Sequence, residues 1–338
     1  MLVVRPVRED DVEKIFDLAA KAETGLTTLP PDMDVLTRRV KESVRSFDSL
    51  PSKPAGETYF FVLEDTDKKK VVGTAAIFSK VGGYQPFYTY RVCNVHKESK
   101  ALNVKKDVQY LQLVIIHDGP TEMGTLFLLP EYRGSQNGRL LSLSRFLFMA
   151  QYRKCFEPYV LVELRGVLDG NDHSPFWDAL GKHFFEVDFR KADLMVMRDK
   201  SFIADLMPEH PIYIPLLPQA AQDVIGKVHV STLPALHMLQ SEGFVFNDEI
   251  DIFEAGPVMK AKLEDIRTVR QSKESKVEKV IADSSAENSL IASVDTFKDF
   301  RVVKGSVVPL DKGVQVSKNT AQALGLKKDS KVRFVSLK

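Results

Sequence analysis

Residues 130–141, PEYRGSQNGRLL, join a turn to the start of a helix, and a join of this kind can bind a phosphate group. The apolar run before it, MGTLFLL, predicts a strand, and the apolar spacing after it predicts a long helix without Gly or Pro. The first turn of such a helix has N–H groups without intrahelical partners and about half a positive charge. Arg133, Gly134 and Gly138 therefore mark a candidate anion site, with Gln136 at a position where a phosphate cradle favours glycine. A plain strand–helix connection is the alternative.

The chain has seven histidines, and histidine is the side chain that titrates nearest to neutral pH. No two of them have the HxxxH or HExxH spacing of a zinc site, so the sequence predicts no metal. His229 lies in KVHVS, whose alternation is typical of a short strand. On the residues alone, this alternation favours a structural place for His229 in such a strand over a catalytic role.

No covalent nucleophile is indicated by the sequence. A Gly-x-Ser-x-Gly motif is absent, and Cys93 and Cys155 each have apolar neighbours, which are typical of buried and inert thiols. These two cysteines form no CxxC pair and no metal spacing, which favours a reducing compartment.

The composition excludes several classes of protein. A net charge of +1 gives no general field for nucleic acid or anionic membranes. Charges throughout the first 16 residues argue against a secretory signal. No apolar run approaches the ~18 residues of a membrane span. We therefore expect a cytoplasmic protein that binds neither nucleic acid nor membrane.

The expected elements follow an α+β order, in which a run of strands ends in a strand–turn–helix. Helices are predicted over 8–23 and 33–50 and after the turn at 130–138. Strands are predicted over 2–7, within 58–81 as a hairpin, and over 86–98, 111–118, 122–130 and 159–169.

Two later stretches share the profile of a short helix, a glycine and a strand, and they hint at an internal duplication. They are residues 174–189 and 233–253, and two unrelated joints are the alternative. A Lys-, Glu-, Ser- and Ala-rich segment without aromatics follows and predicts a linker, and the chain end predicts a small β-rich module with a helix capped by Gly325. For 338 residues we expect two domains over 1–157 and 158–269, a linker over 270–298 and the module over 299–338.

The turn at 133–138 resembles the acyl-CoA pyrophosphate loop of the GNAT-type N-acyltransferase superfamily, Arg/Gln-x-x-Gly-x-Gly/Ala. Arg133 and Gly138 match its first and last positions, and Gln136 departs at the fourth. A wider resemblance to the arginine N-succinyltransferase family extends from Met1 to about Val269. It is carried, in order, by the runs MLVVRPV, GLTTLP, YFFVLED, TLFLLPEYR, SPFWDALGKHFF, LMPEHPIY, AAQDVIGKVH and EIDIFEAGP.

This resemblance implies two N-acyltransferase-like halves that arose by duplication, with mixed sheets and exchanged strands. It implies transfer of succinyl from succinyl-CoA to the α-amino group of L-arginine, giving N2-succinylarginine and CoA, as the first step of arginine catabolism. Succinyl-CoA is then a co-substrate, and no permanently bound cofactor is expected. The alternatives are ornithine or dual use, another acyl donor, and a non-catalytic partner subunit. A homo-oligomer and a pair with a paralogous subunit are both open.

The resemblance also assigns individual positions. His229 matches the histidine of the family's Gly-Gln-Val-His-Pro segment, which is regarded as the proton donor, although Lys227 and Val230 replace Gln and Pro. Leu126 matches a leucine placed against succinyl-CoA, where an edge backbone can pair with the pantetheine amides; a core strand is the alternative. The expected cofactor-binding residues are therefore Leu126, Arg133, Gly134, Gln136 and Gly138.

The acceptor needs a cationic group for its carboxylate and an Asp or Glu for its guanidinium. The sequence offers six candidates: Arg91, Glu163, Arg165, Asp172, Asp248 and Asp251. The loop TGLTTLP, residues 24–30, lies where this superfamily shapes its acceptor site. For each acid among these candidates, a solvated or structural charge is the alternative.

Overall fold

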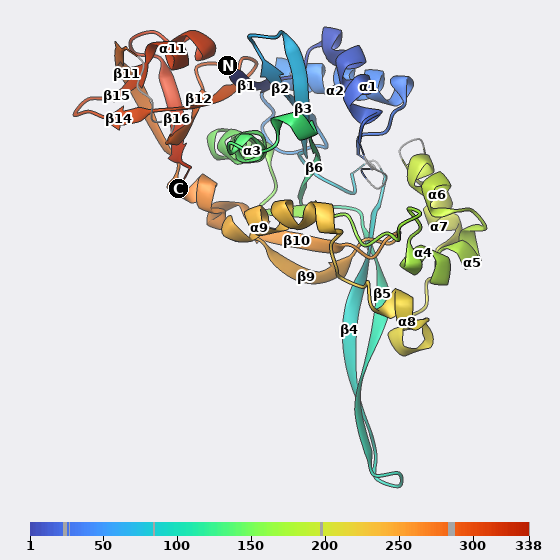
Figure 1. Ribbon diagram of the computed structural model, residues 1–338. Coiled ribbons are helices and arrows are strands. Elements are labelled where there is room, and N and C mark those ends of the chain that lie inside the picture. The colour runs from blue at the N-terminus through green and yellow to red at the C-terminus, as the bar shows by residue number, and fades with distance from the viewer. Residues whose placement is uncertain (23–25, 27, 84, 197–198, 283–287, 338) are drawn as a thin grey trace.

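The computed structural model describes residues 1–22, 26, 28–83, 85–196, 199–282 and 288–337 (Figure 1). Within these ranges the strands form one 16-stranded sheet, in the order β14-β15-β11-β16-β12-β13-β1-β2-β3-β6-β7-β10-β9-β4-β5-β8. Its pairs are mostly antiparallel, and helices accompany them, so the predicted α+β class is confirmed. No helix in the described ranges is both long enough and apolar enough to cross a membrane.

The first part of the chain forms an antiparallel meander with the predicted helices. Its strands are β1 (Leu2–Pro6), β2 (Thr58–Asp65), β3 (Lys70–Phe78) and β6 (Thr121–Leu128), and its helices are α1 (Val12–Ala19), α2 (Met33–Asp48) and α3 (Asn137–Gln151). The Asp32 side chain caps α2 by accepting from the N–H groups of Asp34 and Val35. The predicted strands and helices are therefore present, and turn chemistry fixes where they begin.

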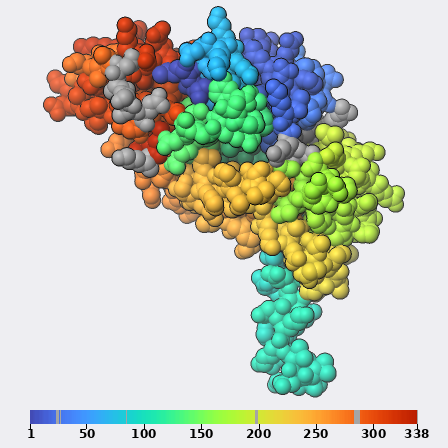
Figure 2. All heavy atoms as spheres, viewed as in Figure 1, coloured from blue at the N-terminus to red at the C-terminus, as the bar shows by residue number. Residues whose placement is uncertain are grey.

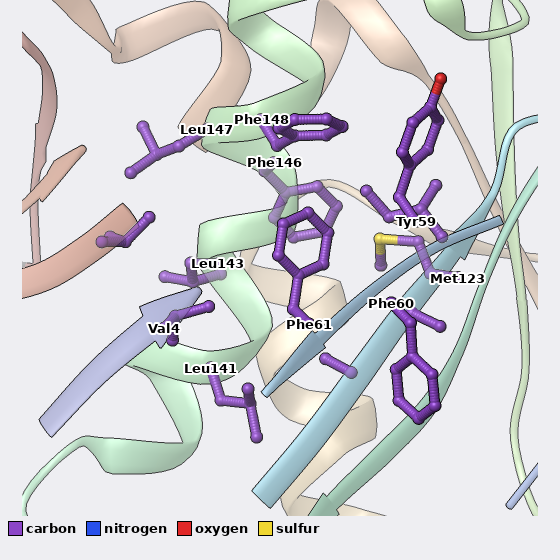
Figure 3. Close-up of a cluster of buried hydrophobic side chains, with 14 of the residues drawn as sticks. Val4, Tyr59, Phe60, Phe61, Met123, Leu141, Leu143, Phe146, Leu147 and Phe148 are labelled. Carbon is purple, nitrogen blue, oxygen red and sulfur yellow. The ribbon is translucent and has the colours of Figure 1, made fainter. Parts of the chain in front are cut away.

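An aromatic core fixes α2 and α3 against the same face of β2. Figure 3 shows the part of this core in which Tyr59 and Phe61 of β2 lie beside Phe148 of α3. Phe47 of α2 and Phe148 of α3 both contact Tyr59 of β2, with ring centroids 5.3 and 5.1 Å apart. Phe61, two residues further along β2, lies on the same face and also contacts both rings. This packing fixes the C-terminal part of α3 against β2.

The second part of the sheet mixes strands from distant parts of the sequence. Its strands are β7 (Tyr159–Glu163), β10 (Pro257–Lys262), β9 (Val245–Ile250), β4 (Phe87–Ser99), β5 (Val104–Ile116) and β8 (Ile212–Tyr213). β4 comes from the first part of the chain but pairs with β9 of the second, with Tyr90 opposite Ile250. The predicted exchange of strands is therefore confirmed. The outer ends of β4 and β5 project from the body as a long arm (Figures 1 and 2).

Short helices cover this second part: α4 (Pro175–Ala179), α5 (Lys182–Phe185), α6 (Phe189–Val196), α7 (Ser201–Leu206), α8 (Gln219–Gln222) and α9 (Leu233–Ser241). The strand expected after Gly181 is wrong, because α5 and the start of α6 occupy those residues. Trp177 stacks on Phe185 and Phe253, with ring centroids 5.2 and 5.3 Å apart, so the aromatic run buries itself locally instead of pairing. At the second stretch, Gly243 at φ +97° does separate α9 from β9. The two profiles are thus not equivalent, and the duplication rests on the family resemblance.

The C-terminal module is larger than predicted. It contains β11 (Lys273–Ile281), β12 (Ser289–Ser293), β13 (Arg301–Gly305), β14 (Val307–Pro309), β15 (Val314–Ser317), α11 (Lys318–Leu324) and β16 (Lys331–Ser336), and α10 (Arg267–Gln271) precedes it. Gly325 caps α11 at φ +66°, as expected.

The interpretation of 270–298 as a linker is wrong. β11 is a largely polar strand whose buried residue is Val277, and it pairs with β15 on one side and β16 on the other. β12 is buried along its whole length between β13 and β16. Backbone pairing on both edges stabilises β11 without an apolar pattern, so composition alone did not reveal it. The division of the remaining chain at 157 stays a prediction.

Candidate active site

The site begins where β6 and β7 part. These parallel strands pair only at Thr121–Val160 and Glu122–Leu161 in the described sheet, while the rest of β6 continues along β3. A cavity of about 260 Å³ opens between the diverging strands. Its walls come from β6, from the end of β7, from α3 and α9, and from the turn between β9 and β10. The backbone edge of β6 beyond Glu122 therefore faces a cavity rather than a strand.

A bulge in β6 shapes this edge. Thr125 adopts φ +57°, which is unfavourable for a β-branched residue, and the β3–β6 register shifts beside it. Its N–H donates to Thr28 Oγ1 at 2.9 Å, and its carbonyl accepts from Thr74 Oγ1 at 2.9 Å. Leu126 follows the bulge, is half-buried and lines the cavity. Its contact with succinyl-CoA stays a prediction.

Part of the predicted acceptor loop, residues 24–30, reaches this cavity. Leu26 and Thr28 line its wall. Residues 24, 25 and 27 lie outside the described part of the chain. The loop thus contributes to the site through Thr28, which also fixes the bulge at Thr125.

The candidate anion turn has the expected strand–turn–helix form. Gly134, Ser135 and Gln136 all have positive φ, at 96°, 44° and 61°, and α3 starts directly after them. The Asn137 side chain closes the turn by donating to the carbonyl of Tyr132 at 3.0 Å. Glycine adopts this left-handed conformation at lower cost than other residues, which explains why a glycine was expected in place of the exposed Gln136.

The two glycines of the turn have open space around them. A Cβ built on Gly134 or Gly138 would meet no protein atom within 4 Å. Packing within the protein therefore does not require Gly138, whereas close approach of a ligand to the helix N-terminus would. Arg133 lines the cavity, and its Nε donates to the carbonyl of Leu128 at 3.2 Å. Lys304 of β13 donates to the carbonyl of Ser135 at 2.6 Å, a second cation at the turn that the sequence did not indicate.

His229 lies beside the cavity wall and not in a strand. It caps a short 3₁₀ turn, Val230–Thr232, and its N–H donates to the carbonyl of Arg165 at 2.9 Å. Its Nδ1 accepts from the N–H of Ser231 at 3.2 Å and lies 2.7 Å from Ser231 Oγ and 3.5 Å from Arg165 Nη1. Because a backbone N–H can only donate, the neutral imidazole carries its proton on Nε2. The strand interpretation of KVHVS is wrong, and both contacts of this ring line the cavity.

Three of the six acceptor candidates reach the cavity: Glu163, Arg165 and Asp251. The other three lie elsewhere. Arg91 pairs with Glu249 at 2.7 Å, Asp172 pairs with Arg190 at the surface, and Asp248 is exposed. Glu122, Asp193 and Glu254 line the cavity as well and were missed, because nothing in their local sequence separates them from other acids.

Burial and neighbouring charges act together on these acids. Burial raises the pKa of Glu163 well above its ordinary value, and Asp251 and Glu122 raise it further. Burial likewise raises the pKa of Glu254 well above its ordinary value, with a further contribution from Asp251. The free cavity therefore favours protonated carboxyls on this wall.

Arg145 is a buried cation in the same cavity. It lies on α3, is 2% exposed, and its Nη1 donates to the carbonyl of Gly124 at 3.2 Å, while Nη2 donates to Ser142 Oγ at 2.9 Å. No carboxylate in the described part of the chain forms an ion pair with it. Burial lowers the pKa of Arg145 to about 9. The sequence did not indicate Arg145 as a site residue, because it lies within an apolar helix pattern.

Comparisons with known proteins find relatives along nearly the whole chain. Residues 2–268 match the family described as Arginine N-succinyltransferase beta subunit, and residues 273–336 match its C-terminal domain. A Yersinia pestis protein described as arginine N-succinyltransferase is 40% identical, covering 100% of this chain and 98% of its own length. An Escherichia coli protein of the same description is 41% identical over the same shares. The structure of arginine/ornithine succinyltransferase subunit AI from Pseudomonas aeruginosa superposes with a TM-score of 0.90 at 32% identity, covering 100% of this chain and 99% of that one.

The first testable prediction concerns Gly138. We expect Gly138→Ala to leave the stability unchanged or to raise it by up to about 1 kcal/mol, since alanine favours the helix and meets no protein atom. The same methyl group would occupy the space above the helix N-terminus and weaken CoA binding roughly tenfold. Thermal denaturation and calorimetric titration with CoA measure the two effects. An unchanged CoA affinity would remove this turn from the ligand site.

The second prediction concerns Gln136. Replacing it by glycine removes a left-handed non-glycine residue, so we expect Gln136→Gly to stabilise the fold by about 0.5–1 kcal/mol. CoA affinity should stay within about twofold or improve, because the backbone donors of the turn are retained. Chemical denaturation and the same calorimetric titration measure both. Loss of CoA affinity would instead assign the Gln136 side chain a direct contact with the ligand.

Proposed function

The chain belongs to the arginine N-succinyltransferase family, and we propose that it transfers succinyl from succinyl-CoA to the α-amino group of L-arginine, a step of arginine catabolism. The observation that carries this proposal is the cavity between β6 and β7. Leu126 and Arg133 on one side, and the contacts of His229 on the other, line this single space. A donor thioester and an acceptor amine could therefore meet there.

We assign the donor to the edge of β6 and the turn before α3. The free backbone of β6 beyond the bulge would pair with the pantetheine amides, as in strand addition. The pyrophosphate would lie at the N-terminus of α3, where helix N–H groups and the cations Arg133 and Lys304 are close. Gly138 leaves the space that this approach requires.

The reaction forms a C–N bond at the thioester carbon and breaks the C–S bond. The α-ammonium group loses one proton before it attacks, and the tetrahedral adduct loses a second as the thiolate gains one. We propose that His229 serves the leaving thiolate as a general acid. In its protonated form the ring gives one proton to the sulfur and becomes neutral, and a proton released by the amine restores the charged form. The contact of the ring with Ser231 fixes its position. No covalent enzyme intermediate is needed, and burial raises the pKa of Cys155, which keeps this thiol protonated.

Arg145 supports a donor with a terminal carboxylate. A buried guanidinium without a carboxylate partner in the described residues is costly unless an anion from outside compensates it. The ω-carboxylate of a succinyl group supplies such an anion, and an acetyl group does not. We propose that Arg145 distinguishes succinyl-CoA from acetyl-CoA.

The proposal places the reaction in the cytoplasm. Both cysteines of the chain are free in the structure, which is usual in a reducing compartment.

The decisive experiment follows free thiol when the purified chain is mixed with succinyl-CoA and arginine, ornithine or lysine in turn. We expect release with arginine. The Pseudomonas aeruginosa relative is described as an arginine/ornithine enzyme, so ornithine is the second acceptor to test. Release with ornithine but not arginine would change the substrate, and no release with any amine would favour a non-catalytic subunit that needs a paralogous partner.

The third prediction concerns His229. We expect His229→Ala to lower kcat by about 100-fold or more while the Kd for CoA stays within about twofold, since loss of a general acid affects turnover and not binding. Stopped-flow thiol release and calorimetry measure the two quantities. Ser231→Ala is the matched control, because it removes a contact of Nδ1 and leaves the ring in place. A parallel loss of turnover and CoA affinity in His229→Ala would make the residue structural.

The fourth prediction concerns Arg145. We expect Arg145→Met to lower kcat/KM for succinyl-CoA at least tenfold relative to acetyl-CoA, since only the succinyl donor carries a carboxylate. This ratio does not depend on the folded fraction, which matters because Arg145 also bonds the carbonyl of Gly124. Arg133→Ala is the control and should weaken both donors alike. An unchanged ratio in Arg145→Met would restrict Arg145 to a structural role.

A further inference from the structure

Four carboxyl groups gather on the cavity wall formed by β6, β7 and the turn after β9. Glu122 lies on β6, Glu163 ends β7, and Asp251 and Glu254 lie in the turn. In the described part of the chain, neither Glu122 nor Glu163 has a side-chain hydrogen bond or ion pair. Lys200 acts electrostatically on both acids and Arg39 acts on Glu122, but in the described residues neither acid is in direct contact with a cation.

The backbone holds this wall rigidly. A Cβ on Gly166 would overlap the carbonyl oxygen of Glu254, and a Cβ on Gly256 would overlap that of Leu164, so the turn after β9 and the segment after β7 are in direct backbone contact. Asp251 Oδ1 accepts from the N–H groups of Phe253 and Glu254, each at 2.7 Å. The acids are therefore preorganised and need not move to meet a ligand.

Glu254 gives an independent sign of a missing partner. It is 7% exposed, its Oε1 accepts from the N–H of Gly166 at 2.7 Å, and its Oε2 has no hydrogen-bond donor in the described structure. A buried oxygen left in this state costs about 1–3 kcal/mol. The wall therefore has acceptor capacity that the protein does not use.

The chemistry of the wall selects the class of ligand. No group of three or more acidic, His or Cys side chains in the described residues is arranged to hold a metal ion. An organic cation with several N–H donors fits better, since a guanidinium group stays charged at any physiological pH and can bind two carboxylates at once. An α-ammonium group fits less well, because it must lose its charge to react.

We propose that Glu163 and Asp251, supported by Glu122 and Glu254, bind the guanidinium group of the acceptor amino acid. This inference rests on the proposed function, and it assigns the acceptor side chain to the carboxyl wall. The α-amino group is then directed towards the thioester beside His229. Within one cavity, Arg145 would bind the anionic group of the donor, and the carboxyl wall would bind the cationic group of the acceptor.

Binding of a cationic ligand should also change the protonation of the carboxyl groups on this wall. Because the free wall favours protonated carboxyls, binding of a guanidinium group should release protons, and arginine should bind more tightly as pH rises through the raised pKa of Glu163. Other charged or titratable groups near the wall or in the same cavity are Glu122, Asp251, Glu254, Asp193, Arg39, Arg133, Arg145, Arg165, Lys200 and His229. Calorimetry in buffers of different ionisation enthalpy counts the released protons.

The fifth prediction compares arginine with citrulline, which has nearly the same shape and a neutral ureido group. We expect Glu163→Gln to weaken arginine binding roughly 10- to 100-fold and to leave citrulline binding within about twofold. Asp251→Asn, which retains the oxygen that accepts from the turn, should act in the same direction. Calorimetric titration of the full chain, without turnover, measures these affinities and the fall in proton release.

Asp248→Asn is the matched control. It removes the same charge from an exposed position outside the cavity, and asparagine tolerates the φ of +53° found there. It should leave arginine affinity unchanged. Glu163→Gln should also melt at the same or a higher temperature, because it relieves repulsion from neighbouring acids.

Two outcomes separate failure of this inference from failure of the proposed function. If Glu163→Gln and Asp251→Asn retain wild-type arginine affinity, the carboxyl wall is not the guanidinium site, whatever the thiol assay gives. If these variants lose arginine affinity but no amine releases thiol, the binding site stands and the proposed reaction fails. Loss of kcat with unchanged arginine affinity would instead make Glu163 a proton acceptor and overturn the inference.

Discussion

The separation of β6 from β7 is the constraint on which the rest of the site depends. Two parallel register pairs hold the strands together at Thr121 and Glu122, and the bulge at Thr125 then turns β6 away. A bulge of this kind stores backbone strain, which is offset here by the hydrogen bond that Thr125 N–H donates to Thr28 and by the one that its carbonyl accepts from Thr74. Without this divergence the sheet would be continuous at this point, and β6 would have no free edge.

The cavity created by this divergence has an uneven distribution of charge. A buried guanidinium belongs to α3, while the carboxyls that form no ion pair in the described residues belong to β6, β7 and the turn after β9. Water solvates such groups poorly in a narrow space, so each raises the free energy of the empty site. Ligands of opposite charge would lower this free energy when they bind in the cavity. This arrangement also agrees with a reaction that joins an anionic acyl group to a cationic amino acid.

The exchange of strands explains how distant residues meet. β4 and β5 close the far side of the second part of the sheet, and the turn after β9 packs on the segment after β7 through Gly166 and Gly256. His229 is tied to the same segment by its backbone bond to Arg165. The C-terminal module contributes Lys304 to the anion turn, because β13 pairs with β1 at the edge of the meander.

The sequence by itself determined the α+β class, the meander and the strand–turn–helix with Gly138, because apolar periodicity and glycine positions act over a few residues. The sequence also indicated the family, through characteristic runs between Met1 and about Val269. Only the tertiary structure decided which acids face the cavity, since Glu163 and Asp248 look alike in sequence and differ only in where the sheet places them. It alone revealed Arg145, hidden in an apolar helix, and the polar strand β11, stabilised by pairing on both edges. Long-range pairing and burial fix these features, and local sequence patterns do not encode them.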